Sequence, residues 1–178
     1  SMSSEKDALR LMFQELVDAM LPYQDAGTGM WYQVINLPNI SPNYLEESGS
    51  AIFSNAIMKG VRLGVLDQRY YQFGRRAFDG ICRTCLSESD GCLTLKNICL
   101  VAGLGNRNHR EGTFDYYMHE PIVENDAKGV APLILAYIET MHHDKLAGTC
   151  DPASPAGCCS LEDPFGGYAA GANMKEHI

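Results

Sequence analysis

A cluster of polar side chains between residues 119 and 128 has the composition of a site for a small polar ligand. It combines carboxylates, an imidazole, an amide and an ammonium group: His119, Glu120, Glu124, Asn125, Asp126 and Lys128. A helical apolar pattern starts near Ala127, where Asn125 or Asp126 is suited to cap the first turn and Pro132 falls in the early turns. Because the N–H groups and the dipole at such an end favour anions, the sequence predicts a corner for a carboxylate or a sugar acid.

A glycine-rich loop precedes this corner. Gly103, Gly105 and Gly112 permit backbone angles that other residues avoid, so residues 102–112 can arch over a pocket as a lid that carries His109. Beyond the lid, apolar and polar residues alternate over residues 114–119, which predicts a short, half-buried strand.

Two other features have the side chains for ligand contact or catalysis, and each also has a structural interpretation. Trp31, the single tryptophan, follows a glycine turn and is either a core aromatic or a flat platform on which a sugar ring stacks. Glu46 and Glu47 fall in the early turns of a predicted helix, where negative charge is favourable without a catalytic role.

The seven cysteines leave a metal or redox role open, but they are too few for a disulfide scaffold at this length. Cys82 and Cys85 lie three apart on a predicted helix, and the second pair that a zinc knuckle requires is missing. We therefore expect buried thiols that act as small apolar side chains, with no metal and no cofactor. Three cysteines lie in the carboxy-terminal tail and could form disulfides with another molecule or be free: Cys150, Cys158 and Cys159.

The composition is that of a folded globular protein and disfavours nucleic-acid and membrane partners. Of the 178 residues, 46% are hydrophobic and 20% charged, and the formal net charge is −8. An acidic chain lacks the clustered Lys and Arg that phosphate binding requires. No apolar run approaches the about 20 residues that span a bilayer, and the polar amino terminus, without an apolar signal segment, favours a cytoplasmic location.

The apolar pattern predicts a mainly α protein whose functional groups gather on the connections between helices. We expect helices over residues 4–23, 43–63, 67–87 and 127–146, with short strands at 30–35 and 92–95. The many small residues of the second helix indicate either close approach of a neighbouring helix or a face left open to ligand. Residues 1–147 would form this domain, and residues 148–178, rich in Gly, Ala and Pro, an irregular tail.

Several long segments resemble the carboxy-terminal half of glycoside hydrolase family 105, the unsaturated rhamnogalacturonyl hydrolases, which are related to the family 88 unsaturated glucuronyl hydrolases. The segments keep the family's order: GMWYQVIN, NYLEESGSAIFSNAIMKGVRLGVLD, ICLVAGLG, REGTFDYYMHEPIVENDAKGVAP and LILAYIE. The resemblance covers about residues 7–139 and implies part of an (α/α)6 toroid of helical hairpins, with short β-strands in the connecting loops.

The resemblance also implies a reaction and a substrate. In this family an acid protonates the vinyl ether of a 4,5-unsaturated uronic acid at the non-reducing end of pectin-type oligosaccharides, water adds at C5, and the hemiketal opens. That chemistry requires a carboxyl group whose pKa is raised by its site. Residues of the far wall of the cradle are expected to bind the substrate: Trp31, His109, His119, Glu124, Asn125, Asp126 and Lys128.

The family's catalytic aspartates, and its WGRGNGW-type segment, belong to the part of the toroid that precedes Asp7, so no acid of this chain takes the catalytic role by position. We expect an inactive portion of a hydrolase, or alternatively a non-catalytic carbohydrate-binding or interaction module. Helices that faced the missing hairpins would expose apolar surface. We therefore expect the chain to pair with itself or with a complementary chain, or its tail to cover that surface.

Overall fold

The first helix forms where the apolar spacing predicts it. A computed structural model describes residues 2–105, 110–146 and 148, and places residues 1–143 in one unit and residues 144–178 in another. Helix α1 (Met2–Met20) continues into a single 3-10 turn, η1 (Leu21–Tyr23), where Pro22 removes a backbone donor. Apart from Gly148, the predicted tail lies outside the described residues.

The second helix begins later than predicted. Strand β1 (Trp31–Tyr32) pairs antiparallel with β2 (Leu45–Glu46), and α2 (Glu47–Arg62) follows directly. Glu46 has extended backbone angles and caps α2, since its carboxylate accepts hydrogen bonds from the N–H groups of Ser48 and Gly49. The Asn43 amide donates to the carbonyls of Val34 and Leu37, which holds the preceding segment in a turn rather than a helix.

The third predicted helix is divided into three elements. A 3-10 turn, η2 (Gln68–Tyr70), leads into α3 (Tyr71–Thr84), and the last predicted helical residues form β3 (Leu86–Ser89) instead. Strand β3 pairs with β4 (Cys92–Leu95) across Asp90 and Gly91, which both have positive φ. The predicted strand at 92–95 is thus confirmed. Helix α3 is shorter than predicted because the Asp-Gly turn permits a β3–β4 hairpin at its carboxy-terminal end.

Small residues bring α2 and α3 close together. Ser50, Ala51 and Ser54 are fully buried, and the Ser54 hydroxyl donates to the carbonyl of Gly74 at 2.8 Å. A Cβ on Gly74 would lie 2.9 Å from the Ser54 carbonyl oxygen. Of the two interpretations of the small residues, close approach of a neighbouring helix is therefore correct.

The predicted strand over residues 114–119 is wrong, because this segment is helix α4 (Phe114–His119). The Thr113 hydroxyl caps it by accepting a hydrogen bond from the N–H of Tyr116 at 3.2 Å. Phe114, Tyr116 and Met118 alternate as in a strand, but Phe114, Tyr117 and Met118 have helical spacing, so the periodicity of so short a segment is ambiguous. The strands beside it are β5 (Ile98–Cys99) and β6 (Ile122–Val123), which pair antiparallel.

The last helix starts as predicted. In α5 (Ala127–Leu146), the Asp126 carboxylate accepts a hydrogen bond from the N–H of Lys128 at 2.9 Å and so caps the first turn. Pro132 lies inside α5, beyond the first turn. A proline has no backbone N–H, and this absence costs least in the first turn of a helix.

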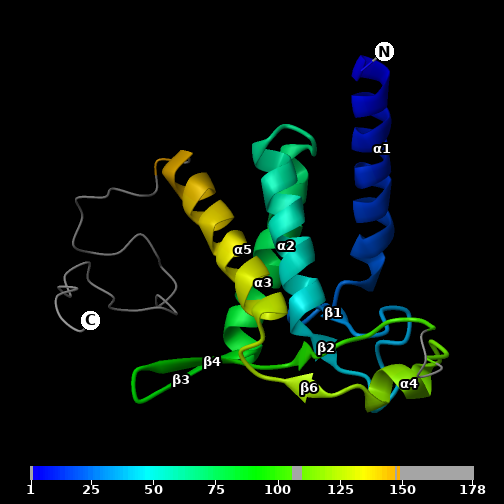
Figure 1. The fold of residues 1–178 in the computed structure, drawn as a ribbon. Helices are drawn as coiled ribbons and strands as arrows, with labels where there is room; N and C mark the ends of the chain where they lie inside the picture. Colours follow the sequence, from blue (N-terminus) through cyan, green and yellow to red (C-terminus); the bar gives the residue numbers. More distant parts are fainter. Residues whose placement is uncertain (1, 106–109, 147, 149–178) are drawn as a thin grey trace, which may run out of the picture. The chain divides into compact units, whose positions relative to one another are not determined.

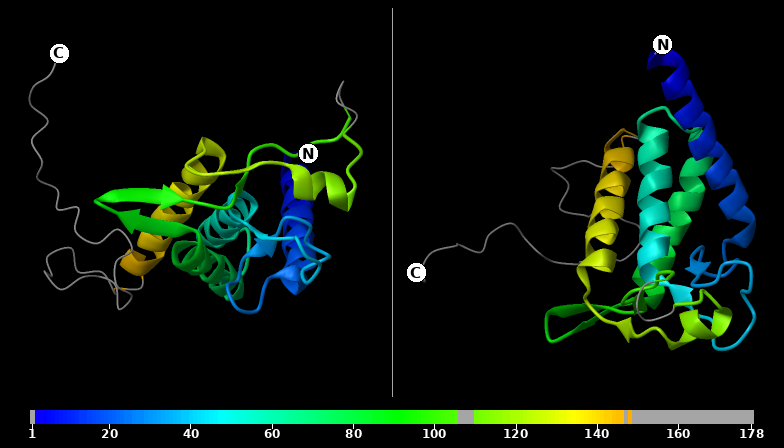
Figure 2. Two further views of the ribbon diagram at one scale, coloured as in Figure 1. Left: turned by 90° about the horizontal axis from the view of Figure 1, so that it is seen from below. Right: turned by 45° about the vertical axis from the view of Figure 1, so that its right-hand side comes forward.

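Within residues 1–143, α2 lies between α1 and α5, with α3 packed against α2 (Figures 1 and 2). One buried cluster joins α2, α3 and α5 through Met58, Ile81 and Ala136, and a second joins α1, α2 and α3 through Val17, Ile57 and Ala77. None of the described helices is both long enough and apolar enough to cross a bilayer.

Candidate functional site

The loops that carry the candidate site meet at one end of the helices. There the amino-terminal ends of α2 and α5 lie beside the β1–β2 and β5–β6 pairs and helix α4 (Figure 2, left). Helix amino termini direct N–H groups and the positive end of the dipole toward this end. The arrangement is favourable for carboxylates, whether they belong to the protein or to a ligand.

Several polar groups of the predicted anion corner are already engaged by other groups of the chain. Asn125, at φ 56°, exchanges hydrogen bonds with the backbone of Leu95: its amide oxygen accepts at 2.8 Å and its N–H donates at 2.9 Å. The Asp126 carboxylate pairs with the Lys128 ammonium at 2.7 Å, and these contacts lower the pKa of Asp126. Glu124 is exposed at the edge of the corner.

Of the two predicted histidines, the structure describes only His119. His119 ends α4, is exposed, and has its Nδ1 2.7 Å from the carbonyl oxygen of Asp115. His109 lies outside the described residues. In the predicted lid, the backbones of Gly105 and Arg110 exchange hydrogen bonds. These two residues flank residues 106–109, which the structure does not describe.

Trp31 is a core residue and not a platform in this chain. Its side chain is 2% exposed, its ring meets Phe53 edge-on, and its indole N–H donates to the carbonyl of Met20 at 2.9 Å. With both ring faces covered, it offers no surface on which a sugar could stack.

Glu46 and Glu47 lie at the amino-terminal end of α2, and their carboxyl groups differ in hydrogen bonding. Glu46 accepts hydrogen bonds from Ser48, Gly49 and the N–H of Cys99. The carboxyl of Glu47 is completely buried, and neither oxygen has a hydrogen-bond partner among the described residues. Burial, and secondarily the neighbouring Glu46, raises the pKa of Glu47 to about 8.

With this pKa, the carboxyl of Glu47 keeps its proton at neutral pH. It is closed off from solvent, and the α5 backbone packs tightly against it: a Cβ added to Gly129 would overlap the carboxyl and lie 2.7 Å from Ile98. Sequence reasoning placed both glutamates at a helix start but did not predict that one of them is buried and unpaired.

A second set of polar groups, here called the loop cluster, lies between the β1–β2 pair, β5 and α4: Gln33, Tyr44, Cys99, Arg110, Tyr116 and Glu120. The Gln33 amide donates to the thiol of Cys99 at 3.5 Å. Burial, and then the neighbouring Cys99, raises the pKa of the Tyr44 hydroxyl. Tyr44 and Cys99 both also interact electrostatically with Glu120.

The other side of the loop cluster is formed by the edge of the lid. The Tyr116 hydroxyl accepts a hydrogen bond from the N–H of Gly103 at 3.1 Å and interacts with Glu120 and Arg110. The cluster thus combines hydroxyls, an amide, a carboxylate and a guanidinium, the donors and acceptors that recognise a sugar acid. The sequence reasoning included Glu120 in its polar run but missed the other members, which the fold brings together from distant segments.

Cys85 and Cys99 are buried and Cys82 is half-buried, as expected of structural thiols, whereas Cys92 is exposed. Cys82, Cys85, Cys92 and Cys99 are free. Burial raises the pKa of Cys82 to about 12 and that of Cys85 to about 11, so both resist ionisation. In the part of the chain that the structure describes, no three potential metal ligands are grouped.

Comparison with known proteins identifies a family and two curated relatives. The sequence profile of Glycosyl Hydrolase Family 88 matches residues 2–143. Protein Atu3128 of Agrobacterium fabrum is 41% identical over 120 residues, which are 64% of this chain and 52% of that protein. A 24.9 kDa protein in the picA locus of Rhizobium radiobacter matches with the same figures, so the chain spans about half the length of these relatives.

Solved structures show the same partial correspondence. A family 105 glycoside hydrolase from C. acetobutylicum is 40% identical with a TM-score of 0.75, and the match covers 78% of this chain and 39% of the other. A possible family 105 member from Salmonella enterica is 26% identical with a TM-score of 0.60, over 75% of this chain and 32% of that one. The helices of this chain thus form part of a helical toroid, and the chain belongs to Glycosyl Hydrolase Family 88, with family 105 glycoside hydrolases among its structural neighbours.

Proposed function

We propose that this chain is the carboxy-terminal portion of an unsaturated-uronide hydrolase and supplies one wall of the sugar-acid cradle without the proton donor. The observation that carries the proposal is the match of residues 2–143 to the family together with the 39% coverage of the C. acetobutylicum hydrolase. The intended reaction is hydration of a 4,5-unsaturated uronic acid at the non-reducing end of a pectin-type oligosaccharide. The chain alone is expected to be inactive.

The loop cluster supports this role and extends the predicted binding set. Arg110 lies beside Gly103 and Tyr116, where a guanidinium is suited to pair with the carboxylate of the uronide. Tyr116 and Glu120 offer hydrogen bonds to sugar hydroxyls, and His119, Glu124 and Lys128 remain proposed contacts. His109 also remains a proposed contact, but it lies outside the described residues.

Activity should require the missing part of the ring. Hydration removes the ring double bond and with it the ultraviolet absorbance of the unsaturated uronide. We expect no loss of absorbance with the 178-residue chain alone. Loss is expected after refolding it together with the portion of the C. acetobutylicum hydrolase that precedes the matched region. Turnover by the chain alone would overturn the claim that the acid is missing.

Substrate contact by the loop cluster can be measured separately. In titration calorimetry with an unsaturated digalacturonide, Arg110→Ala should weaken binding about tenfold, since a charge-assisted bidentate pair contributes about 1.5–3 kcal/mol. Arg83→Ala, at the exposed end of α3, is the matched control and should bind like the original chain. Equal binding by both variants would exclude Arg110 from the cradle.

The alternative is a non-catalytic carbohydrate-binding or interaction module built on the same scaffold. It is favoured by the hydrogen bonds that already engage Asn125 and Asp126 within the chain. Binding of the digalacturonide by the isolated chain, with no turnover in the reconstituted mixture, would favour this alternative.

A further inference from the structure

The side chain of Glu46 contacts two elements, helix α2 and strand β5. As the cap of α2, its Oε1 accepts a hydrogen bond from the N–H of Ser48 at 3.1 Å, and its Oε2 accepts one from the N–H of Gly49 at 2.6 Å. Oε1 also accepts a hydrogen bond from the N–H of Cys99, 53 residues along the chain, at 3.0 Å. One buried carboxylate thus joins the amino-terminal end of α2 to β5.

The length of the glutamate side chain permits this second contact. Ser, Thr, Asn and Asp are the usual capping residues, because their short side chains already reach the N–H groups of the first helical turn. Glu46 has one methylene group more than aspartate and also reaches Cys99. An aspartate would therefore be sufficient to cap α2, whereas the link to β5 requires the longer side chain.

Strand β5 contributes Cys99 to one side of the loop cluster. The thiol of Cys99 accepts a hydrogen bond from the Gln33 amide at 3.5 Å and interacts with the Tyr44 hydroxyl. Gln33 directly follows β1 and Tyr44 directly precedes β2. The position of β5 against the β1–β2 pair therefore determines how these three groups meet.

The residues that follow β5 connect it to the other side of the loop cluster. Leu100 donates its N–H to the carbonyl of Pro121 at 2.8 Å, directly after Glu120 in the chain. Gly103 donates its N–H to the hydroxyl of Tyr116 at 3.1 Å. A displacement of β5 would thus disturb both sides of the cluster.

We propose that Glu46 is a positioning residue for sugar binding: its carboxylate fixes β5 against the start of α2 and so holds the loop cluster in the arrangement that receives the uronide. This inference rests on the proposed function and assigns a role at the same site to a residue that does not itself touch the sugar. Hydrogen bonds to a carboxylate are stronger than those between neutral groups, which suits an anchor between two elements.

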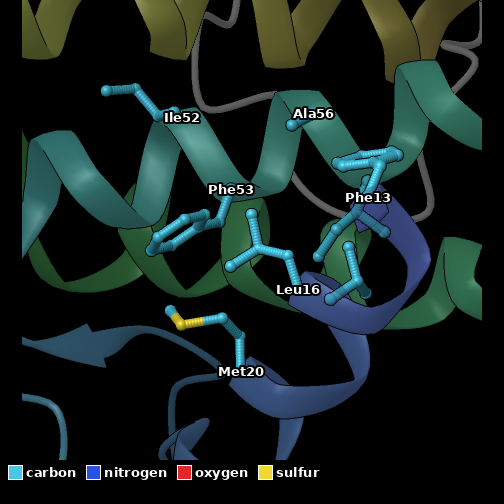
Figure 3. Close-up of a pocket in the computed structure, with 8 residues that line it drawn as sticks. Phe13, Leu16, Met20, Ile52, Phe53 and Ala56 are labelled. Atoms are coloured by element: carbon cyan, nitrogen blue, oxygen red, sulfur yellow. The ribbon is translucent and has the colours of Figure 1, made fainter. Parts of the chain in front are cut away.

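The remainder of α2 is held by contacts that do not involve Glu46. Apolar side chains of α1 and α2 face one another around a pocket between the two helices: Phe13, Leu16, Met20, Ile52, Phe53 and Ala56 (Figure 3). On the side of α3, the buried Ser54 donates a hydrogen bond to the carbonyl of Gly74. Substitutions at Glu46 should therefore act at the end of α2 and leave the helices folded.

Two substitutions at Glu46 separate the cap of α2 from the link to β5, and amide hydrogen exchange followed by NMR reads each one directly. Glu46→Asp keeps a carboxylate within reach of Gly49 but is too short for Cys99. Glu46→Gln keeps the length, so its amide oxygen can still accept from Cys99, but its NH2 group cannot accept from Gly49. Exchange should accelerate about tenfold at Cys99 in the first variant and at Gly49 in the second, because each loses that hydrogen bond. Exchange at Gly103 should follow Cys99, because both depend on β5.

Sugar binding gives the second measurement, in titration calorimetry of the full chain with the unsaturated digalacturonide. Glu46→Asp should weaken binding about fivefold or more, because fewer molecules hold the cluster in its binding arrangement, whereas Glu46→Gln should stay within about twofold of the original chain. Both variants lose hydrogen bonds and some stability, so a merely structural role would weaken binding in both. Glu88→Asp, the same change at an exposed position of β3, is the matched control and should alter neither exchange nor binding.

Circular dichroism melting establishes that each variant is folded at the temperature of these measurements. Unchanged exchange at Cys99 and Gly103 in Glu46→Asp would overturn the proposal, and so would equal weakening of sugar binding by the two Glu46 variants. If the original chain does not bind the digalacturonide, the proposed function fails at this site. Exchange at Gly103, which is measured without sugar, then still decides whether Glu46 holds the loop cluster in place.

Discussion

Adjacent carboxyl groups in this chain differ in chemistry because their surroundings differ. Glu46 accepts hydrogen bonds from three residues, whereas Glu47 accepts none among the described residues and is completely buried. In the sequence the two glutamates are equivalent, since both are acids at the start of a helix. In the fold they differ, because Glu46 caps α2 and accepts hydrogen bonds while Glu47 is buried where the α5 backbone packs closely at Gly129.

Glu47 should make folding stability depend on pH. Between its ordinary pKa of 4.5 and the folded-state pKa of about 8, the folded protein keeps a proton that the unfolded chain releases. The free energy of unfolding should therefore fall as pH rises through this window, by up to about 1.4 kcal/mol per pH unit, and level off above it. Glu47→Gln, which is neutral and similar in shape, should remove this decline in urea unfolding at several pH values.

Glu46→Gln is the matched control for that experiment. It should destabilise the protein by about 1–3 kcal/mol at neutral pH, because it weakens bonds from donors that are buried with the carboxylate. It should leave most of the pH-dependent decline in place. If the Glu47→Gln variant kept the decline and the Glu46→Gln variant lost it, the assignment of the proton to Glu47 would be wrong.

At the scale of the elements, close contacts between backbones set the spacing of the helices. A Cβ on Gly80 of α3 would overlap the carbonyl of Thr28 and lie 3.3 Å from Met30. Gly80→Ala should therefore cost about 1–3 kcal/mol in denaturant unfolding, because the Thr28 backbone cannot yield as a flexible side chain could.

Gly27→Ala is the matched control for Gly80→Ala. Its added Cβ would meet only the Asp25 carboxylate, at an ordinary 3.4 Å. The free energy of unfolding should change little, and equal losses in the two variants would show that the contact at Thr28 is not the cause.

The sequence predicts the long helices well because their apolar stripes repeat over many residues. It predicts α4 wrongly because six residues satisfy two periodicities. It starts α2 at residue 43, too early, because the helix begins only after the capping carboxylate of Glu46. The loop cluster could not be predicted, since Gln33, Cys99 and Tyr116 meet only through the pairing of distant segments. Trp31 was left with two interpretations, and burial decided between them.

At the scale of the whole molecule, an ion pair links two of the long helices, α2 and α5. The guanidinium of Arg62 on α2 forms a bidentate pair with Glu139 on α5, at 2.6 and 2.8 Å. This pair lowers the pKa of Glu139, so its contribution to stability is present near neutrality and is lost as pH falls through that depressed value. The two helices are therefore joined at both ends, by charge here and by close packing at Gly129.

The packing at Gly129 has a consequence for engineering of the protein. No side chain fits between the α5 backbone and the carboxyl of Glu47 with Ile98 alongside. In a library with codon 129 randomised and selected for soluble expression, glycine should dominate the survivors. The neighbouring, exposed codon 128 should accept a broad range of amino acids.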